Sequence, residues 1–136
     1  MKVLLIDDDP IEHKLFEAYF VGLEEPKHEL VAVPTLREGL CQLDQAGFGA
    51  VFLDNRLSSG ERYGETLPNI IQTAQGTRIY LISACTSGLR KVSREFPGVE
   101  VLNKFDIKAA LEAGLLDRST HGANAQTSAV RPPAIA

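Results

Sequence analysis

The sequence predicts an α/β fold in which five parallel strands form one doubly wound sheet with five helices packed around it. Three observations lead to this prediction. Five short apolar segments alternate with segments of helical periodicity along the 136 residues. Most of the apolar segments are unbroken, which is typical of strands buried on both faces of a parallel sheet. Carboxylate residues follow the first and third segments, where such a sheet binds its ligands.

The five predicted strands are rich in β-branched and aliphatic residues. In chain order they are VLLI (3–6), LVAV (30–33), AVFL (50–53), IYLI (79–82) and VEVL (99–102). For such alternating strand and helix units with right-handed connections, the common arrangement is the flavodoxin-like (βα)5 fold with strand order 2-1-3-4-5. Its ligand crevice lies where the carboxyl ends of strands one and three meet.

Apolar residues at helical spacing follow each predicted strand. Asp9, Pro10 and Glu12 match the N-cap, the first helical residue and the capping-box acid of the first helix. Thr35 is the predicted N-cap of the second helix, and a short third helix is expected near Pro68. The apolar positions of the five helices are, in order, Ile11, Leu15 and Tyr19; Leu36, Leu40 and Leu43; Ile70, Ile71 and Ala74; Leu89, Val92 and Phe96; and Ile107, Ala110, Leu111 and Leu115.

The composition is that of an ordinary globular protein, with 44% apolar residues, 24% charged residues and a net charge of −4. The length suits one domain with a sizeable core, and the acidic balance argues against nucleic acid as a partner. No apolar run approaches the length of a membrane span, and no signal-type segment follows the first residues. We therefore expect a cytoplasmic protein without a membrane anchor.

Residues 1–116 are predicted to form the domain, and residues 117–136 a flexible C-terminal tail. From Asp117 onward the sequence shifts to Ala, Ser, Thr, Asn and Pro without apolar periodicity. The cysteines and histidines are isolated, fit no metal-ligand spacing and are assigned no role. They are Cys41, Cys85, His13, His28 and His121.

Three carboxylates are predicted to converge at the crevice. Asp7 and Asp8 follow the first strand and Asp54 follows the third. Such a group does not stay fully ionised at neutral pH without compensation, and hard oxygen ligands suit Mg²⁺ or Mn²⁺. The sequence therefore predicts a divalent metal site at this edge of the sheet.

Two further residues are expected at the same edge. Lys104 follows the fifth strand and Ser83 follows the fourth, which adds an ammonium and a hydroxyl group. With one divalent ion, the three carboxylates and the lysine balance to zero charge. The set suits a phosphoryl group, and Asp54 is the predicted nucleophile because it stands alone while Asp7 and Asp8 are better placed to hold metal.

On these five residues, the sequence resembles the receiver domains of two-component response regulators over residues 1–116, and in particular the stand-alone single-domain members. The resemblance implies that Asp7 and Asp8 are the family's acidic pair and that Asp54 is the phosphoacceptor. It further implies that Ser83 is the family's switch Ser/Thr residue and that Lys104 is the lysine of the family's active site. It also implies that Mg²⁺ is held by Asp8, Asp54 and the backbone carbonyl of Arg56.

The resemblance implies a phosphorylation-switched signalling protein. A histidine kinase or histidine phosphotransfer protein would supply the phosphoryl group, and output would pass to an unidentified protein target by protein–protein contact. The chain would not be an enzyme acting on other substrates, because it would catalyse only its own phosphorylation and dephosphorylation. Homodimerisation is left open.

Several positions depart from the family pattern. Ser58 and Arg62 replace the usual proline and glycine in a loop that looks about two residues longer, Phe105 replaces the proline after the lysine, and Val101 replaces the switch aromatic residue. Because a non-proline cis bond costs roughly 2.5 to 4 kcal/mol, we expect the Lys104–Phe105 peptide to be trans.

Two alternatives to a phosphorylation switch are considered. The departures keep open a receiver-like adaptor that binds partners constitutively, without switching. An aspartyl phosphatase is disfavoured, because Asp54 is followed by Asn55 and Arg56 and lacks the second Asp of a DxD motif.

Overall fold

The protein is described here from a computed structural model covering residues 1–23, 28–45, 47–57, 60 and 62–117. Five parallel strands form one sheet in the order β2-β1-β3-β4-β5, which confirms the predicted fold class and strand order. The strands are β1 (Lys2–Ile6), β2 (Glu29–Val33), β3 (Phe48–Asp54), β4 (Arg78–Ser83) and β5 (Val99–Asn103). Each predicted strand is present and extends one to three residues beyond the predicted bounds.

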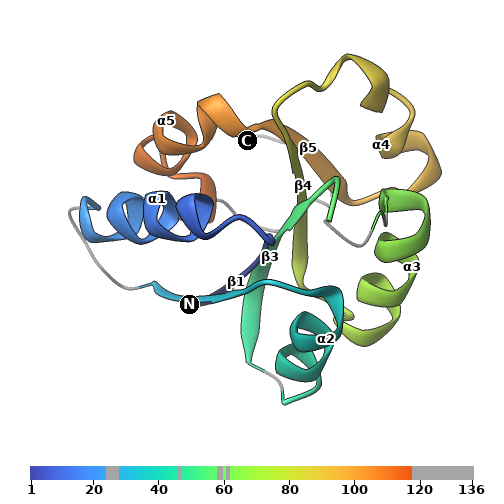
Figure 1. The fold of residues 1–136 in the computed structure, drawn as a ribbon, viewed down its shortest axis with the longest axis horizontal. Helices are drawn as coiled ribbons and strands as arrows, with labels where there is room; N and C mark the ends of the chain where they lie inside the picture. Colours follow the sequence, from blue (N-terminus) through green and yellow to red (C-terminus); the bar gives the residue numbers. More distant parts are fainter. Residues whose placement is uncertain (24–27, 46, 58–59, 61, 118–136) are drawn as a thin grey trace, which may run out of the picture.

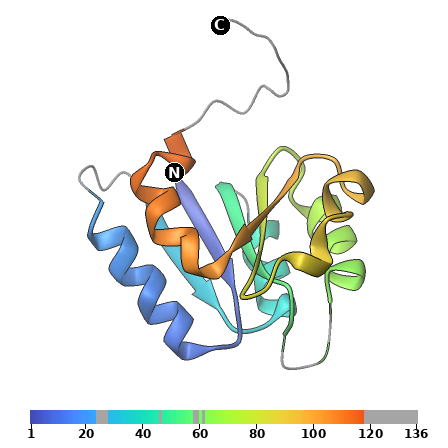
Figure 2. The same cartoon turned by 90° about the horizontal axis from the view of Figure 1, so that it is seen from above.

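Helices cover both faces of the sheet (Figure 1). Helices α1 (Pro10–Val21) and α5 (Ile107–Glu112) lie on one face, and α2 (Leu36–Asp44), α3 (Tyr63–Thr73) and α4 (Val92–Glu95) lie on the other. Three short 3₁₀ turns, η1 (Ser87–Leu89), η2 (Lys104–Asp106) and η3 (Leu115–Asp117), complete the described chain. The same layers appear from above in Figure 2.

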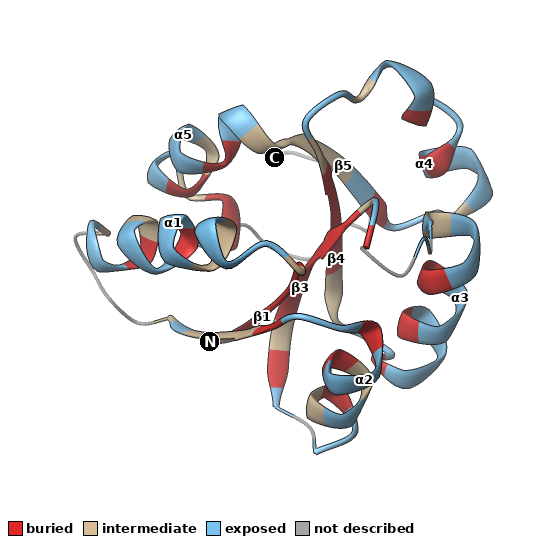
Figure 3. Ribbon diagram, viewed as in Figure 1, coloured by how far each residue is buried: buried red, intermediate tan, exposed pale blue. Residues whose placement is uncertain are grey.

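The sheet divides the core into two apolar clusters. Alternate residues of β1 point to opposite faces, so Val3 and Leu5 join the cluster under α1 and α5. Leu4 and Ile6 join the larger cluster under α2, α3 and α4. The central strands are accordingly buried along nearly their whole length (Figure 3). This rigid sheet holds the strand ends, and therefore the candidate site, in fixed positions.

The buried face of helix α1 matches the prediction only at Tyr19, which packs against the core. Ile11 is 66% exposed and Leu15 is 40% exposed, whereas Phe16 and Phe20 are buried. The spacing of four residues fits both pairs equally well, and the aromatic pair removes more apolar surface from water. The Phe16 ring packs edge-on against Phe52 of β3, with 5.3 Å between ring centroids.

The start of α1 follows the prediction only in part. The Asp9 carboxylate accepts a hydrogen bond from the Ile11 backbone N–H at 2.9 Å, and Pro10 begins the helix, as predicted. The capping box is wrong, because the backbone N–H of Asp9 donates to Asp7 Oδ1 at 2.9 Å and not to Glu12. The Glu12 carboxylate instead approaches Lys104.

The predicted helix over residues 89–96 is shorter and interrupted. It is replaced by η1 and the four-residue α4, and Phe96 leaves the helical region with φ −131° and ψ 80°. Proline at position 97 explains this end, because the residue before a proline is disfavoured in the α conformation. Helix α3 in turn begins at Tyr63, earlier than expected, and contains Pro68 in its interior.

The domain boundary is not resolved by the described chain, which ends at Asp117 within η3. The predicted tail, apart from Asp117, lies outside the described residues, as do Ser58 and part of the loop after Asp54. Among the helices that the structure describes, none has the length and apolarity needed to cross a bilayer.

Candidate functional site

The three predicted carboxylates meet at the carboxyl edge of the sheet. Asp7 follows β1, Asp54 is the last residue of β3, and both are buried, while Asp8 is half-buried. One oxygen atom from each of Asp7, Asp8 and Asp54 lies within 4.8 Å of the others. Hydrogen bonding between β1 and β3 in parallel register brings the two strand ends together. The predicted convergence is confirmed.

Lys104 reaches this cluster from the end of β5. Its Nζ lies 3.2 Å from Asp7 Oδ2 and 3.4 Å from Asp54 Oδ1, so the predicted contact with the carboxylates is present. The long, flexible stem of lysine allows this reach. Lys104 is therefore the cation that partly offsets the buried acids.

Glu12 is a fourth acid near the cluster, and the sequence analysis missed it. Its Oε1 lies 3.9 Å from Lys104 Nζ, and its side chain is only 14% exposed. A usable signal was its place in the first turn of α1, because helical side chains point back toward the N-terminus and here toward the strand ends.

The acids at the site perturb one another's proton affinity. Burial, and then the nearby Asp7, raise the pKa of Asp54 to about 6, against the opposing effect of Lys104. Burial likewise raises the pKa of Glu12. Burial alone would lower the pKa of Lys104, but Asp54 and Asp7 outweigh it and the pKa is raised. The Lys104 ammonium therefore stays charged, but its single positive charge does not fully offset the negative charge of the carboxylates.

The segment after Asp54 is held against the site by its backbone. The Arg56 N–H donates to Asp54 Oδ1 at 3.3 Å, and the Asn55 N–H donates to the Ile82 carbonyl of β4 at 2.9 Å. Arg56 is exposed and its side chain lies at the rim. The turn fixes the Asp54 carboxylate in place through local hydrogen bonds.

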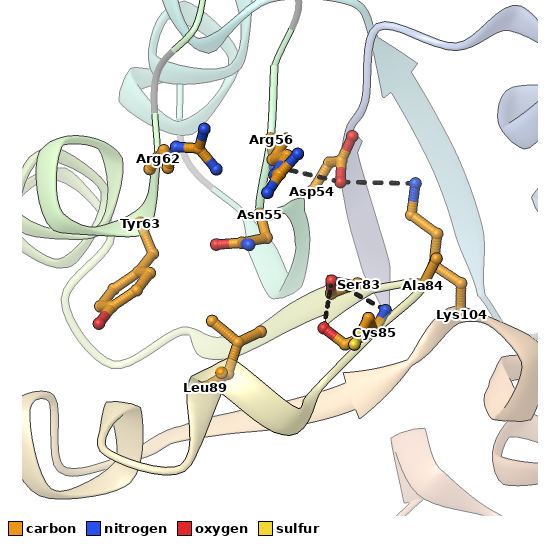
Figure 4. A pocket seen from close by; sticks show the side chains of 11 residues that line it. Asp54, Asn55, Arg56, Arg62, Tyr63, Ser83, Ala84, Cys85, Leu89 and Lys104 are labelled. Carbon is orange, nitrogen blue, oxygen red and sulfur yellow. Dashed lines mark hydrogen bonds and ion pairs between the residues drawn. The ribbon is translucent and has the colours of Figure 1, made fainter.

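Ser83 lies at the predicted edge, but its hydroxyl is engaged locally. Ser83 Oγ donates to the Cys85 carbonyl at 2.8 Å and accepts from the Cys85 N–H at 3.2 Å (Figure 4). The thiol of Cys85 is exposed and lines the same rim, and its hydrogen bond with Ser87 lowers its pKa. Cys85 was given no role from the sequence.

A pocket of about 620 Å³ opens beside Asp54. Figure 4 shows Asp54 and Lys104 at one end and Tyr63 with Arg62 at the other, with Arg56 between them. Ser83, Cys85 and Leu89 form another wall. The Asp54 carboxylate, which is the predicted nucleophile, therefore faces a space that solutes can enter.

The connection after Lys104 has the predicted geometry. No cis peptide bond occurs in the part of the chain that the structure describes, so the Lys104–Phe105 bond is trans as expected. Asn103 Oδ1 accepts from the Phe105 N–H at 2.9 Å and starts the 3₁₀ turn η2. The Phe105 side chain is 82% exposed.

The donor set fits a hard divalent cation. Asp7, Asp8 and Asp54 offer carboxylate oxygens close together, and no cysteine or histidine belongs to the cluster within the described ranges. Oxygen donors of this kind suit Mg²⁺ or Mn²⁺ more than softer metals. Two of the three carboxylates are buried, so a cation there would offset charge that water screens poorly.

Comparison with known proteins gives structural matches only. No protein-family model matches the sequence, and no curated protein matches it. The structure is similar to the phosphorylated cyanobacterial phytochrome response regulator RcpA, with TM-score 0.70 and 20% identity over 88% of this chain and 96% of that one.

Two further similar structures are receiver domains. One, from the sensor histidine kinase PA1611 of Pseudomonas aeruginosa, has TM-score 0.65 and 20% identity over 85% of this chain and 94% of that one, and it carries a magnesium ion in its active-site cleft. The other is a CheY-like response regulator receiver domain from Methylobacillus flagellatus, with TM-score 0.66 and 20% identity over 86% and 97% of the two chains.

Proposed function

We propose that this chain, which has the fold of response-regulator receiver domains, accepts a phosphoryl group on Asp54 and signals by binding other proteins. The observation that carries the proposal is the convergence of Asp7, Asp8, Asp54 and Lys104 at one edge of the sheet. A histidine kinase or histidine phosphotransfer protein would be the donor, in the cytoplasm. The chain would act on no other substrate.

Each residue has a role in the proposed transfer. A carboxylate oxygen of Asp54 attacks phosphorus, the bond from phosphorus to the donor atom breaks, and the donor keeps the electron pair and takes up a proton. The product is an acyl phosphate on Asp54. Lys104 would pair with one oxygen of the phosphoryl group. Ser83 would break its hydrogen bonds with Cys85 and donate a hydrogen bond from its hydroxyl to a second phosphoryl oxygen. Water later attacks phosphorus and restores the carboxylate with release of phosphate.

Asp7, Asp8 and Asp54, with the backbone carbonyl of Arg56, would hold Mg²⁺, and Mn²⁺ would be a substitute. Bound there, the ion supplies charge neutralisation for the phosphoryl oxygens. The raised pKa of Asp54 supports this proposal, because Lys104 offsets only part of the negative charge of the buried acids. Asp7, which is fully buried, would also hold Lys104 in place through its contact at 3.2 Å.

Intact mass spectrometry tests the proposal directly. Incubation with acetyl phosphate and Mg²⁺ should add one phosphoryl mass to the wild-type chain and none to Asp54→Asn. Asp44→Asn, an exposed carboxylate at the end of α2, is the matched control and should be labelled like the wild type. Labelling of Asp54→Asn, or a lack of labelling in the wild type, would overturn the assignment.

A constitutive adaptor is the second candidate, and two observations favour it. The Ser83 hydroxyl is hydrogen-bonded to Cys85, and Phe105 is exposed where the family has proline. An adaptor would bind its partner equally well as wild type and as Asp54→Asn, with or without phosphodonor. A change in partner affinity on phosphorylation would favour the switch.

A further inference from the structure

The pocket beside Asp54 extends well beyond the space that one phosphoryl group needs. Its volume of about 620 Å³ is in the ordinary range for sites that hold a small molecule. Asp54 and Lys104 lie at one end, and the lining continues to Arg62 and Tyr63 at the start of α3. The far end of the pocket is not used by the proposed phosphoryl chemistry.

Two arginines line the pocket beyond Asp54, with Arg62 at the far end and Arg56 between it and Asp54. Figure 4 shows the Arg62 side chain extending from the start of α3 toward Arg56. Within the part of the chain that the structure describes, neither guanidinium group forms an ion pair with a carboxylate. The nearest acid along α3, Glu65, accepts from the backbone N–H of Arg62 at 3.3 Å. Two cations that face one space repel each other unless an anion lies between them.

One buried polar atom beside the pocket, the side-chain oxygen of Asn55, also lacks a hydrogen-bond partner among the described residues. Asn55 Oδ1 is buried and accepts no hydrogen bond from any described residue, although Asn55 lines the same pocket. An unpaired acceptor needs a hydrogen-bond donor such as water, so the support for an anion comes from the arginines and not from Asn55. Arg62 is also the N-cap of the eleven-residue α3, whose positive dipole end favours an anion.

The end of the pocket at Tyr63, next to Arg62, is fixed by contacts with α4. The Tyr63 hydroxyl donates to Glu95 Oε1 of α4 at 3.1 Å, and its ring lies edge-on to Phe96 with 6.1 Å between centroids. Tyr63 therefore holds α3 and α4 together and presents a defined surface. The pocket is bounded on this side without any movement of the chain.

We propose that Arg56 and Arg62 form a second anion subsite, which receives a phosphate or carboxylate carried next to the group bound at Asp54. The ligand class is a small molecule with two anionic groups, one for each end of the pocket. The inference rests on the proposed function only for placing the first anion beside Asp54. Arginine is suited to the second, because its planar guanidinium binds phosphate and carboxylate in a bidentate manner.

Calorimetric titration with inorganic pyrophosphate and with orthophosphate, at equal free Mg²⁺, tests the subsite. The wild type should bind pyrophosphate at least about tenfold more tightly than orthophosphate, since one charge-assisted pair is worth about that factor. Arg62→Gln should reduce this preference to about twofold or less. Arg37→Gln, an exposed arginine on α2, is the matched control and should keep the full preference.

Phosphonoacetate carries a carboxylate in place of the second phosphate and so identifies which anion the arginines prefer. Tighter binding of pyrophosphate or phosphonoacetate than of orthophosphate supports the subsite. Equal affinity of the wild type for all three probes, or an unchanged preference in both Arg62→Gln and Arg56→Gln, would overturn it. Thermal unfolding confirms that each variant is folded. Phosphoryl uptake is measured separately by intact mass, so a wild type that takes up a phosphoryl group but shows no preference for the probes with two anionic groups rejects the subsite alone.

Discussion

Replacement of Asp54 by Asn should stabilise the fold in the absence of metal. The side chain of Asp54 is only 11% exposed and lies beside Asp7, and these surroundings raise its pKa from the ordinary 3.8 to about 6. At neutral pH the folded protein therefore holds an ionised carboxylate in a place that disfavours it. Asparagine has a similar shape and carries no charge.

The magnitude follows from the two proton affinities. Between about pH 4 and pH 6 the folded chain binds more protons at this position than the unfolded chain, so stability is lost as the pH rises through this window. The loss amounts to about 3 kcal/mol at pH 7.5 and to about half of that at pH 5. Asp54→Asn removes this loss, so the free energy of unfolding should rise by about 3 kcal/mol at pH 7.5 and by about half of that at pH 5.

Urea unfolding followed by circular dichroism at pH 7.5 and pH 5, with a chelator present, measures the gain. Glu17→Gln, an exposed carboxylate on α1, is the control and should change stability by less than about 0.5 kcal/mol. Added Mg²⁺ should stabilise the wild type more than the variant and so narrow the difference. A variant less stable than the wild type at pH 7.5, or a gain equal at both pH values, would refute the electrostatic account.

Three further outcomes are expected. Asp8→Asn should lose the Mg²⁺-dependent rise in unfolding temperature, since one of three clustered oxygens is removed, and an equal rise in both proteins would exclude Asp8 as a ligand. Gly39→Ala should destabilise the fold by about 1 to 3 kcal/mol in urea unfolding, because the added Cβ would overlap the Ile6 side chain. In the control Gly64→Ala the added Cβ meets no atom within 4 Å, so similar losses in both variants would contradict this packing. A chain truncated after Asp117 should fold and take up a phosphoryl group, because residues 118–136 carry few large apolar side chains, and failure by intact mass would show that they are needed.

The parts of the site that the sequence predicted are those that the topology dictates. Carboxyl ends of neighbouring parallel strands must lie at one edge, so Asp7 and Asp54 meet whatever their side chains do. Lys104 is similar, because it follows β5 directly and its stem is long enough to tolerate small errors in placement. Backbone connectivity alone was sufficient for these predictions.

The features that escaped prediction depend on local competition between alternatives. The predicted burial of Ile11 and Leu15 on α1 was wrong because two sets of residues share the same spacing, and only packing on the sheet selects Phe16 and Phe20. Glu12 could accept a hydrogen bond from the backbone N–H of Asp9 or approach Lys104. It approaches Lys104, because the Asp9 N–H donates to Asp7. Such choices are decided by neighbours that spacing in the sequence does not reveal.

The local hydrogen bonds of Ser83 have a consequence for the background level of signalling under the proposed function. Its hydroxyl makes two bonds with Cys85. If each contributes about 0.5 to 1.5 kcal/mol, only about 1 to 15% of the molecules have this hydroxyl released at any moment. That minority is the population from which an active conformation would be drawn before any phosphoryl group arrives. The turn at Ser83 thus limits how often the protein would signal without a stimulus, and a stronger or weaker turn would move that resting level.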